Sequence, residues 1–255
     1  MYQQEAIDTQ QCHDKFRDVA NASTSMTTAH PFFNCFRSFD EIASFLDRLL
    51  LSSRPSNRHL LKVPIASTVQ GHPIFGYHWT KPSKGRALLY IQAGIHPREW
   101  ALDDWDIVFV PVVNVDGYKL TWSAPANRLW RKNARGIDLN RNFGPASYFT
   151  ATNDTASETY SGPYAMSEPE TKGVRFTTSP SCDDEATMSK VGEAVASAMN
   201  NAGTFKDMVY LSLNRTPSLT IELRGESGFM ASSGSIRRSG DELVEAIGAF
   251  AAQLH

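Results

Sequence analysis

A histidine and a glutamate three residues apart are the pair in this sequence best suited to bind one metal ion together. They are His96 and Glu99, in the segment HPREW, which directly follows the apolar run at residues 87–95. On one helical turn or in a tight loop, an imidazole nitrogen and a carboxylate oxygen at this spacing can bind the same zinc ion. Binding crevices in α/β proteins open where strands end, so the position after a buried strand also favours a site. An ordinary turn with a solvated glutamate has the same pattern, so the pair needs support elsewhere in the chain.

A group of arginines follows in the segments NRLWRKN and DLNRNF. Arg131 and Arg141 lie close in the sequence to Asn140, and Arg128 is in the same group. Guanidinium groups are always charged and bind carboxylates through two parallel hydrogen bonds, so the group could hold a carboxylate. A solvated basic loop is the competing interpretation. We favour that interpretation for Arg128 and Arg135, which no other pattern distinguishes.

The order of seven segments resembles the catalytic domain of the zinc metallocarboxypeptidases of the pancreatic carboxypeptidase type. Seven ordered segments are difficult to obtain by chance, and they extend from about Phe39 to the C-terminal helix. The segments are FDEIASFLDRL, VQGHPI, GIHPREW, NRLWRKN, DLNRNF, SETYSGPYAMSEPE and TIELRGESGF. Members of this family remove single residues from the C-termini of peptides.

The resemblance implies a metal ion and a base. His96 and Glu99 match two of the zinc ligands, and Glu222 matches the general base. Zinc lowers the pKa of a bound water to about 7, and a carboxylate nearby can then take its proton. The expected cofactor is one Zn²⁺ ion.

The resemblance also implies how substrate is held. Arg131, Asn140 and Arg141 match the groups that bind the terminal carboxylate and polarise the scissile carbonyl, and Arg98 lies in the same pocket in relatives. An arginine clamp on the free carboxylate restricts cleavage to the last residue. The expected partners are therefore the C-termini of peptides or proteins.

The third zinc ligand of the family has no counterpart in this sequence. Relatives carry a histidine in a motif similar to SIHSY, whereas no histidine lies here between HPREW and the last residue, His255. Because catalytic zinc normally has three protein ligands and a water, two ligands should bind it more weakly. A catalytically inactive or truncated relative is therefore the alternative to an active carboxypeptidase.

Two alignments of the segment MVYLSLN stay open. One puts Asn214 near the missing ligand, although a neutral amide oxygen is a poor zinc ligand. The other puts Tyr210 near the mobile tyrosine that covers substrate in the family, which makes it a candidate substrate-binding residue. A tyrosine in the core of a strand is the competing interpretation.

The elements that must position these residues form an α/β pattern. Apolar residues at spacings of three and four predict an amphipathic helix over 38–51, with Ser38 as its N-cap and Glu41 three residues later. Two strands follow at 59–68 and 72–80, separated by a tight turn with Gly71.

The apolar runs at 87–95 and from Asp106 predict two buried strands. We therefore expect an α/β fold with a mixed parallel and antiparallel sheet flanked by helices, as in carboxypeptidases but incomplete. Only residues 101–105 separate HPREW from the second of these strands, and a parallel crossover needs about a dozen residues. We expect that the two strands are no longer parallel neighbours or that the fold is locally rebuilt.

The loop that reads the last substrate residue in the family is also missing before TIEL.

Charge and hydropathy exclude several classes of partner. The 25 basic and 27 acidic residues give a net charge of −2, which argues against nucleic acid or an anionic membrane as partner. No apolar run approaches the roughly 20 residues of a membrane-spanning helix. The opening stretch is too polar for a secretory signal, so secretion is implied only by the resemblance, since relatives are usually secreted or extracellular. We expect a monomer.

The start of the chain is polar and lacks sustained periodicity. We expect residues 1–33 to be a disordered tail and residues 34–255 to form one metallocarboxypeptidase-like catalytic domain. The three cysteines, Cys12, Cys35 and Cys182, are an odd number at no zinc-like spacing. They predict neither a disulfide framework nor a structural metal site.

Overall fold

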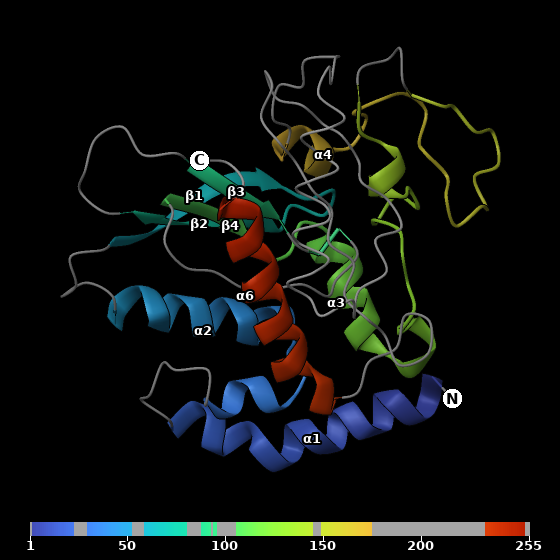
Figure 1. Ribbon diagram of the computed structural model, residues 1–255. Helices are drawn as coiled ribbons and strands as arrows, with labels where there is room; N and C mark the ends of the chain where they lie inside the picture. The colour runs from blue at the N-terminus through green and yellow to red at the C-terminus, as the bar shows by residue number, and fades with distance from the viewer. Residues whose placement is uncertain are drawn as a thin grey trace. The chain divides into compact units, whose positions relative to one another are not determined.

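In the computed structural model, four strands form one sheet in the order β1-β2-β4-β3 (Figure 1). Strands β1 (His59–Ser67) and β2 (Pro73–Thr80) are antiparallel, and β2 is also antiparallel to β4 (Asp106–Val110). Strand β3 (Leu88–Gln92) lies parallel to β4 at the end of the sheet. The sheet is therefore mixed, which together with the flanking helices confirms the predicted α/β class.

The chain divides into two compact units. The first contains residues 1–98 and 104–175, and the second contains residues 99–103 and 176–255. The structure describes residues 2–22, 30–52, 59–80, 88–92, 94–95, 106–144, 149–174 and 233–252. The sheet and all predicted site residues that the structure describes belong to the first unit. The predicted boundary between a tail and a catalytic domain at residue 34 stays a prediction.

The turn between β1 and β2 has the geometry that its glycine predicted. Gly71 adopts a φ of 83°, a left-handed conformation that glycine accepts without strain. Its N–H donates to the Thr68 carbonyl at 3.0 Å, and the Thr68 N–H donates to the His72 carbonyl at 2.8 Å. These two bonds close the hairpin.

The connection between β3 and β4 corrects one expectation. The two strands are parallel neighbours, with Leu88 opposite Asp106 and Gln92 opposite Val110. Strand β3 ends at Gln92, three residues earlier than predicted, so residues 93–105 form the connection. A connection of that length satisfies the requirement of about a dozen residues for a parallel crossover. The expectation that the strands are no longer parallel neighbours is wrong, because it left HPREW out of the connection.

Helix α2 (Phe39–Ser52) begins at the predicted cap. The N–H and hydroxyl of Ser38 donate to Oε2 of Glu41 at 3.1 and 2.8 Å, and the Glu41 N–H lies 3.4 Å from the Ser38 hydroxyl. This reciprocal arrangement satisfies backbone donors that the helix itself leaves free. The predicted apolar face of α2 buries three side chains, Ile42, Phe45 and Leu46.

A short helix before α2 adds aromatic packing to that face. In η1 (Pro31–Asn34), Phe32 stacks on Phe45 of α2 with ring centroids 4.1 Å apart. Phe33 meets the same ring edge-on at 5.6 Å. The ordered segment before α2 therefore includes residues for which we expected a tail.

The structure corrects the expected disorder of residues 2–22, which form helix α1 (Tyr2–Ala22). It also corrects the prediction of no disulfide, because Cys12 of α1 is bonded to Cys35, with Cα atoms 5.9 Å apart. Helix α1 carries no wide apolar stripe, so hydrophobic periodicity gave no signal for it. The odd number of cysteines concealed this pairing in the sequence; the third, Cys182, lies outside the described residues.

Four more helices are described in the first unit, and one of them, η3, carries Asn140 and Arg141. They are α3 (Val115–Ser123), η2 (Pro125–Asn127), η3 (Leu139–Arg141) and α4 (Pro169–Gly173). Asn114 caps α3 by accepting a hydrogen bond from the Gly117 N–H at 2.9 Å. Its amide donates to the Lys132 carbonyl at 3.1 Å, which joins α3 to the segment that carries Arg131.

The described part of the second unit comprises η4 (Ser233–Ser235) and α6 (Ile236–Ala252). Leu243, Ala246, Ile247 and Phe250 are buried and recur at spacings of three and four, so one face of α6 is apolar. Among the described residues, no helix has both the length and the hydropathy needed to cross a membrane.

Candidate carboxylate-binding site

The structure describes three of the eight predicted site residues, Arg131, Asn140 and Arg141. The other five lie outside the described residues: His96, Arg98, Glu99, Tyr210 and Glu222. The geometry therefore concerns the candidate carboxylate-binding group, whereas the roles of the other five residues stay predictions.

Arg131 is held by a buried carboxylate. Its Nε and Nη2 atoms both contact Oδ2 of Asp138, at 2.8 and 2.7 Å. The Asp138 side chain is 0% exposed and the Arg131 side chain is 21% exposed. A guanidinium group has five N–H donors, so this pairing leaves three for another acceptor, two of them on Nη1. The guanidinium is thus fixed in place and still reaches solvent.

The same carboxylate begins the turn that carries the other two residues. Oδ1 of Asp138 accepts a hydrogen bond from the Asn140 N–H at 3.0 Å, and the Asp138 carbonyl accepts one from the Arg141 N–H at 3.0 Å. These bonds cap η3 and leave the side chains of Asn140 and Arg141 exposed. Asp138 therefore joins Arg131 to the turn with Asn140 and Arg141.

The backbone around Asp138 is anchored on both sides. The Asp138 N–H donates to the Tyr160 carbonyl at 2.8 Å, and Leu139 is only 1% exposed. The exposed Arg141 donates through Nη1 to the carbonyl of Asn140 at 3.1 Å. An exposed amide and two guanidinium groups on one short, anchored segment can bind a carboxylate, because each offers several donors.

The chain is also fixed just before the predicted metal pair. Gly94 has a φ of 68°, and a Cβ there would lie 2.8 Å from the Cα of Val112. Its carbonyl accepts a hydrogen bond from the Asn114 N–H at 3.0 Å. Only glycine allows this close approach. Glycine is therefore required at position 94, two residues before His96.

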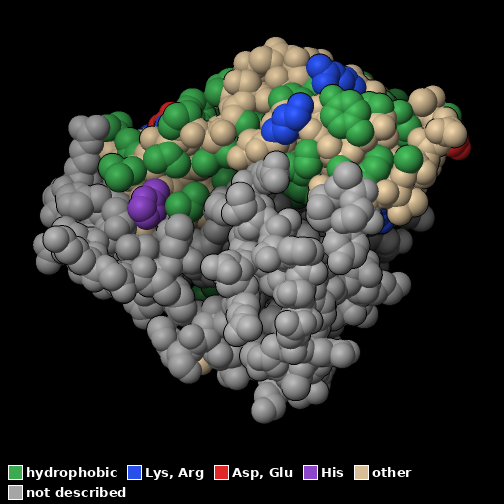
Figure 2. All heavy atoms as spheres, turned by 90° about the horizontal axis from the view of Figure 1, so that it is seen from above, with side chains coloured by type: hydrophobic (Ala, Val, Ile, Leu, Met, Phe, Trp, Pro, Cys, Tyr) green, Lys and Arg blue, Asp and Glu red, His purple; other side chains and the backbone are tan. Residues whose placement is uncertain are grey.

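The described residues contain no group of three or more His, Cys, Asp or Glu side chains that could hold a metal ion. His96 and Glu99 lie outside that part of the chain. Among the described residues, pockets of about 430 and 370 Å³ occur, and neither is lined by Arg131, Asn140 or Arg141. Figure 2 shows one face of the molecule, on which Lys and Arg side chains stand among exposed hydrophobic side chains.

Comparison with known proteins shows which proteins the chain is similar to. Residues 101–181 match the family described as zinc carboxypeptidase, and this range contains Arg131, Asn140 and Arg141. Human carboxypeptidase B2 is 30% identical over an alignment 197 residues long, which covers 62% of this chain and 45% of that protein. Bovine carboxypeptidase A1 is 32% identical over an alignment 206 residues long, which covers 66% of this chain and 47% of that protein. This chain is similar to zinc carboxypeptidases.

Solved structures agree with that relationship. Bovine thrombin-activatable fibrinolysis inhibitor, solved in complex with tick carboxypeptidase inhibitor, matches with a TM-score of 0.68 and 26% identity, over 87% of this chain and 98% of that chain. Carboxypeptidase A from Helicoverpa armigera shares the fold, with a TM-score of 0.73 and 21% identity over 96% of this chain and 79% of that chain. This chain spans about half the length of the curated proteins it matches.

Two buried asparagines support the site, and sequence reasoning missed both. Oδ1 of Asn133 accepts hydrogen bonds from the N–H groups of Arg135 and Ile137, each at 3.0 Å, and so shapes the loop between Arg131 and Asp138. Its amide donates to Oε2 of Glu168 at 2.8 Å. The side chain is 0% exposed, so these bonds replace water completely.

Asn142 has the same role on the other side of η3. Its amide donates to the carbonyl of Ser161 and the hydroxyl of Ser167, at 2.8 and 2.9 Å. Its carbonyl oxygen accepts from the hydroxyl of Thr171 at 2.8 Å. Buried polar groups of this kind are bonded on every side and hold one conformation. The sequence held one signal for this supporting role: in the segment NRNF, Asn142 directly follows the predicted site residue Arg141.

Two buried glutamates complete this polar layer. Glu168 and Glu170 are 1% and 0% exposed, and both accept from the amide of Asn133. Burial raises the pKa of Glu170, and the charge of Glu168 acts in the same direction. Oε1 of Glu170 also accepts from the Val69 N–H at 3.1 Å, which ties the layer to the turn between β1 and β2.

Two neighbouring cations have positions unlike that of Arg131. The ammonium group of Lys132 is turned inward and donates to the carbonyls of Ser157 and Thr155, at 2.6 and 3.2 Å. The side chain of Arg135 is 54% exposed and lies 3.5 Å from Oε2 of Glu168. Half exposure agrees with the solvated position that we favoured for Arg135.

Proposed function

We propose that this chain is a zinc-dependent carboxypeptidase that hydrolyses the C-terminal peptide bond of peptides or proteins. The observation that carries the proposal is the pairing of Arg131 with the buried Asp138, at the start of the turn that exposes Asn140 and Arg141. That arrangement lies inside the range matched by the zinc carboxypeptidase family.

The arrangement suits a free peptide terminus. Arg131 keeps its Nη1 donors free of Asp138, and Arg141 adds a second cation on an exposed side chain. Charge-assisted bonds to a carboxylate are roughly twice as strong as neutral ones, so a terminal carboxylate is preferred over an internal amide. Selection for the free terminus is what limits cleavage to the last residue.

The proposed metal ligands are His96 and Glu99, and their imidazole and carboxylate groups have the donor chemistry that zinc accepts. They are one fewer than the three protein ligands usual at catalytic zinc. A bound zinc ion would polarise the scissile carbonyl and acidify a water. Glu222 would take the proton from that water, and Arg131 would stabilise negative charge on the carbonyl oxygen.

A relative that binds peptide C-termini without hydrolysing them is the second candidate. One observation favours it: no histidine stands between His96 and His255, so the family's third ligand is missing. Both candidates require the same arginine group, and only hydrolysis requires Glu222. The two functions can therefore be separated by measuring binding and cleavage on the same peptide.

The experiment uses the full chain, zinc in the buffer, and an N-blocked peptide with either a free or an amidated C-terminus. A carboxypeptidase releases one residue from the free peptide only, a chelator stops it, and Glu222→Gln abolishes release while binding persists. Binding of the free peptide without any release would favour the second candidate. Equal binding of the free and amidated peptides would contradict both.

A further inference from the structure

We propose that the pocket beside His72 binds a pyranose sugar, a ring that carries several neutral hydroxyl groups and has an apolar C–H face. The volume of this pocket is about 430 Å³, within the range of roughly 300 to 1,000 Å³ that is usual for small-molecule sites. The His72 pocket, as we call it, is lined by Gln70, His72, Asp116, Lys119, Leu120 and Trp130 among others. The candidate carboxylate-binding residues do not line it, so the proposal is independent of carboxypeptidase activity.

A buried network holds the imidazole ring of His72 in one orientation. Nδ1 of His72 lies 2.7 Å from Oδ1 of Asp116, whose side chain is 1% exposed. The hydroxyl of Thr68 donates to the same oxygen at 2.7 Å, and the Gln70 N–H donates to Oδ2 at 3.0 Å. Asp116 thus has the several donors that a buried carboxylate requires. The network joins the turn between β1 and β2 to α3 and fixes the ring between them.

This orientation presents one acceptor atom to a ligand. Because the carboxylate of Asp116 accepts hydrogen bonds, the proton of the neutral His72 ring lies on Nδ1 and leaves a lone pair on Nε2. The His72 side chain is 35% exposed, and no other described residue bonds to its Nε2. Nε2 can therefore accept a hydrogen bond from a ligand hydroxyl.

Trp130 provides a flat apolar wall of the His72 pocket. The residue is 38% exposed, and its Nε1–H donates to the Lys132 carbonyl at 2.5 Å, which restricts rotation of the indole. Leu120 of α3 adds aliphatic surface to the same pocket. The C–H face of a pyranose ring can pack on such an indole through dispersion, without any charge on the ligand.

The charged side chains on the described lining already have partners. Asp116 is paired with His72, and Nζ of Lys119 lies 3.3 Å from Oδ1 of Asp40. An ionic ligand would have to compete with one of these partners for its charge. A neutral ligand leaves both pairs in place, so the His72 pocket favours a neutral ligand.

The polar groups of the lining combine acceptors with donors. Nε2 of His72 accepts, the exposed amide of Gln70 can accept and donate, and the ammonium group of Lys119 has further N–H donors besides the one directed at Asp40. A hydroxyl group both donates and accepts, so the hydroxyls of one sugar ring can bond to all three. A carboxylate only accepts, and it would leave Nε2 without a donor.

An NMR titration of the full chain tests the proposal. The ligands are the methyl glycosides of glucose, galactose, mannose and N-acetylglucosamine, with benzoate as a flat anion for comparison. The signals of the Trp130 indole N–H and the His72 ring report on binding. We expect at least one glycoside to shift both signals with a Kd of about 1 mM or lower, and benzoate to bind at least about tenfold more weakly.

Variants of the lining locate the contacts. His72→Asn keeps an N–H donor for Asp116 at the position of Nδ1 but lacks Nε2, and Trp130→Ala removes the indole face. Each should weaken binding of the glycoside by roughly three- to tenfold. Gln70→Ala changes an exposed side chain outside the Asp116 network and should also weaken binding. Leu129→Ala is the matched control, because Leu129 is 39% exposed and does not line the pocket.

Three results would overturn the proposal. The first is that none of the four glycosides shifts the signals in the millimolar range. The second is tighter binding of benzoate than of every glycoside, because the pocket would then select charge. The third is binding that His72→Asn, Trp130→Ala and Gln70→Ala leave unchanged, or that Leu129→Ala weakens equally, because the sugar would then bind elsewhere.

Discussion

Asp138 is the residue through which the candidate carboxylate site is assembled. One of its carboxylate oxygens accepts from Arg131, the other accepts from the Asn140 N–H, and the side chain is fully buried. A buried carboxylate is costly unless it is both paired and hydrogen-bonded. The pair and the turn therefore depend on each other, and the position of Arg131 depends on both.

We predict that Asp138→Asn lowers the free energy of unfolding by about 2 to 4 kcal/mol. The asparagine oxygen can still accept from the Asn140 N–H, but the charge that balances Arg131 is lost. Urea unfolding followed by circular dichroism measures the change. Glu242→Gln is the matched control, because it removes the partner of Arg238, whose side chain is 73% exposed, and should cost less than about 1 kcal/mol. Equal losses in the two variants would argue against a special role for Asp138.

We also predict that Arg131→Gln weakens binding of a peptide with a free C-terminus by roughly 10- to 100-fold, because a hydrogen bond to a charged group is lost. Calorimetry on the Glu222→Gln background measures binding without cleavage. Arg135→Gln is the control for overall charge and should bind as its parent does. A similar loss in both variants would mean that the protein's net field, and not Arg131, attracts the peptide.

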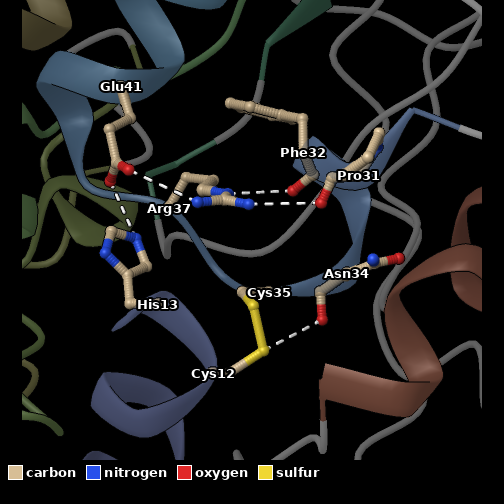
Figure 3. Close-up of a disulfide and its surroundings, with 8 residues drawn as sticks. All are labelled: Cys12, His13, Pro31, Phe32, Asn34, Cys35, Arg37 and Glu41. Carbon is tan, nitrogen blue, oxygen red and sulfur yellow. Dashed lines mark hydrogen bonds and ion pairs between the residues drawn. A yellow bond between two sulfur atoms is a disulfide. The ribbon is translucent and has the colours of Figure 1, made fainter. Parts of the chain in front are cut away.

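Helix α2 depends on a carboxylate at its first turn. Burial raises the pKa of Glu41, but hydrogen bonds from His13 (Figure 3) and from Ser38 outweigh burial and lower the pKa to about 2. Because this pKa lies below the unfolded value of about 4.3, the ionised Glu41 stabilises the fold above pH 4.3. That contribution is lost as the pH falls from about 4.3 towards 2.

The pH dependence of Glu41→Gln tests this cap. Glutamine can still accept from Ser38, so the variant keeps the cap and loses the charge. We expect the natural chain to be more stable than the variant at pH 5, with the difference shrinking as the pH is lowered to 2. Urea unfolding of both proteins across that range measures it. A difference that does not change with pH would show that the charge of Glu41 contributes nothing.

Local elements of the fold were predictable where a short pattern determines them. The Ser38–Glu41 cap specified the start of α2, and Gly71 specified the hairpin, because each acts within a few residues. Helix α1 was not predictable in this way, since it is held by a disulfide to a residue 23 positions away. Periodicity within one segment carries no information about such a distant partner.

The candidate site shows the same division. Residue types and the resemblance pointed to Arg131, Asn140 and Arg141. The structure links all three to Asp138, through its carboxylate for Arg131 and Asn140 and through its backbone carbonyl for Arg141. The supporting groups were missed because their partners come from distant segments: Asn133 and Asn142 bond to residues between Ser161 and Thr171. Only the folded chain brings these segments together.

For the molecule as a whole, the central claim is that a relative with two recognisable family ligands still works as a zinc enzyme. The most direct test is the zinc content per folded chain after dialysis against metal-free buffer, by elemental analysis beside circular dichroism. We predict about one zinc ion per chain, falling to near zero in His96→Ala, because His96 is one of the two family ligands present. A cooperatively folded chain that retains no zinc would contradict the proposed carboxypeptidase activity.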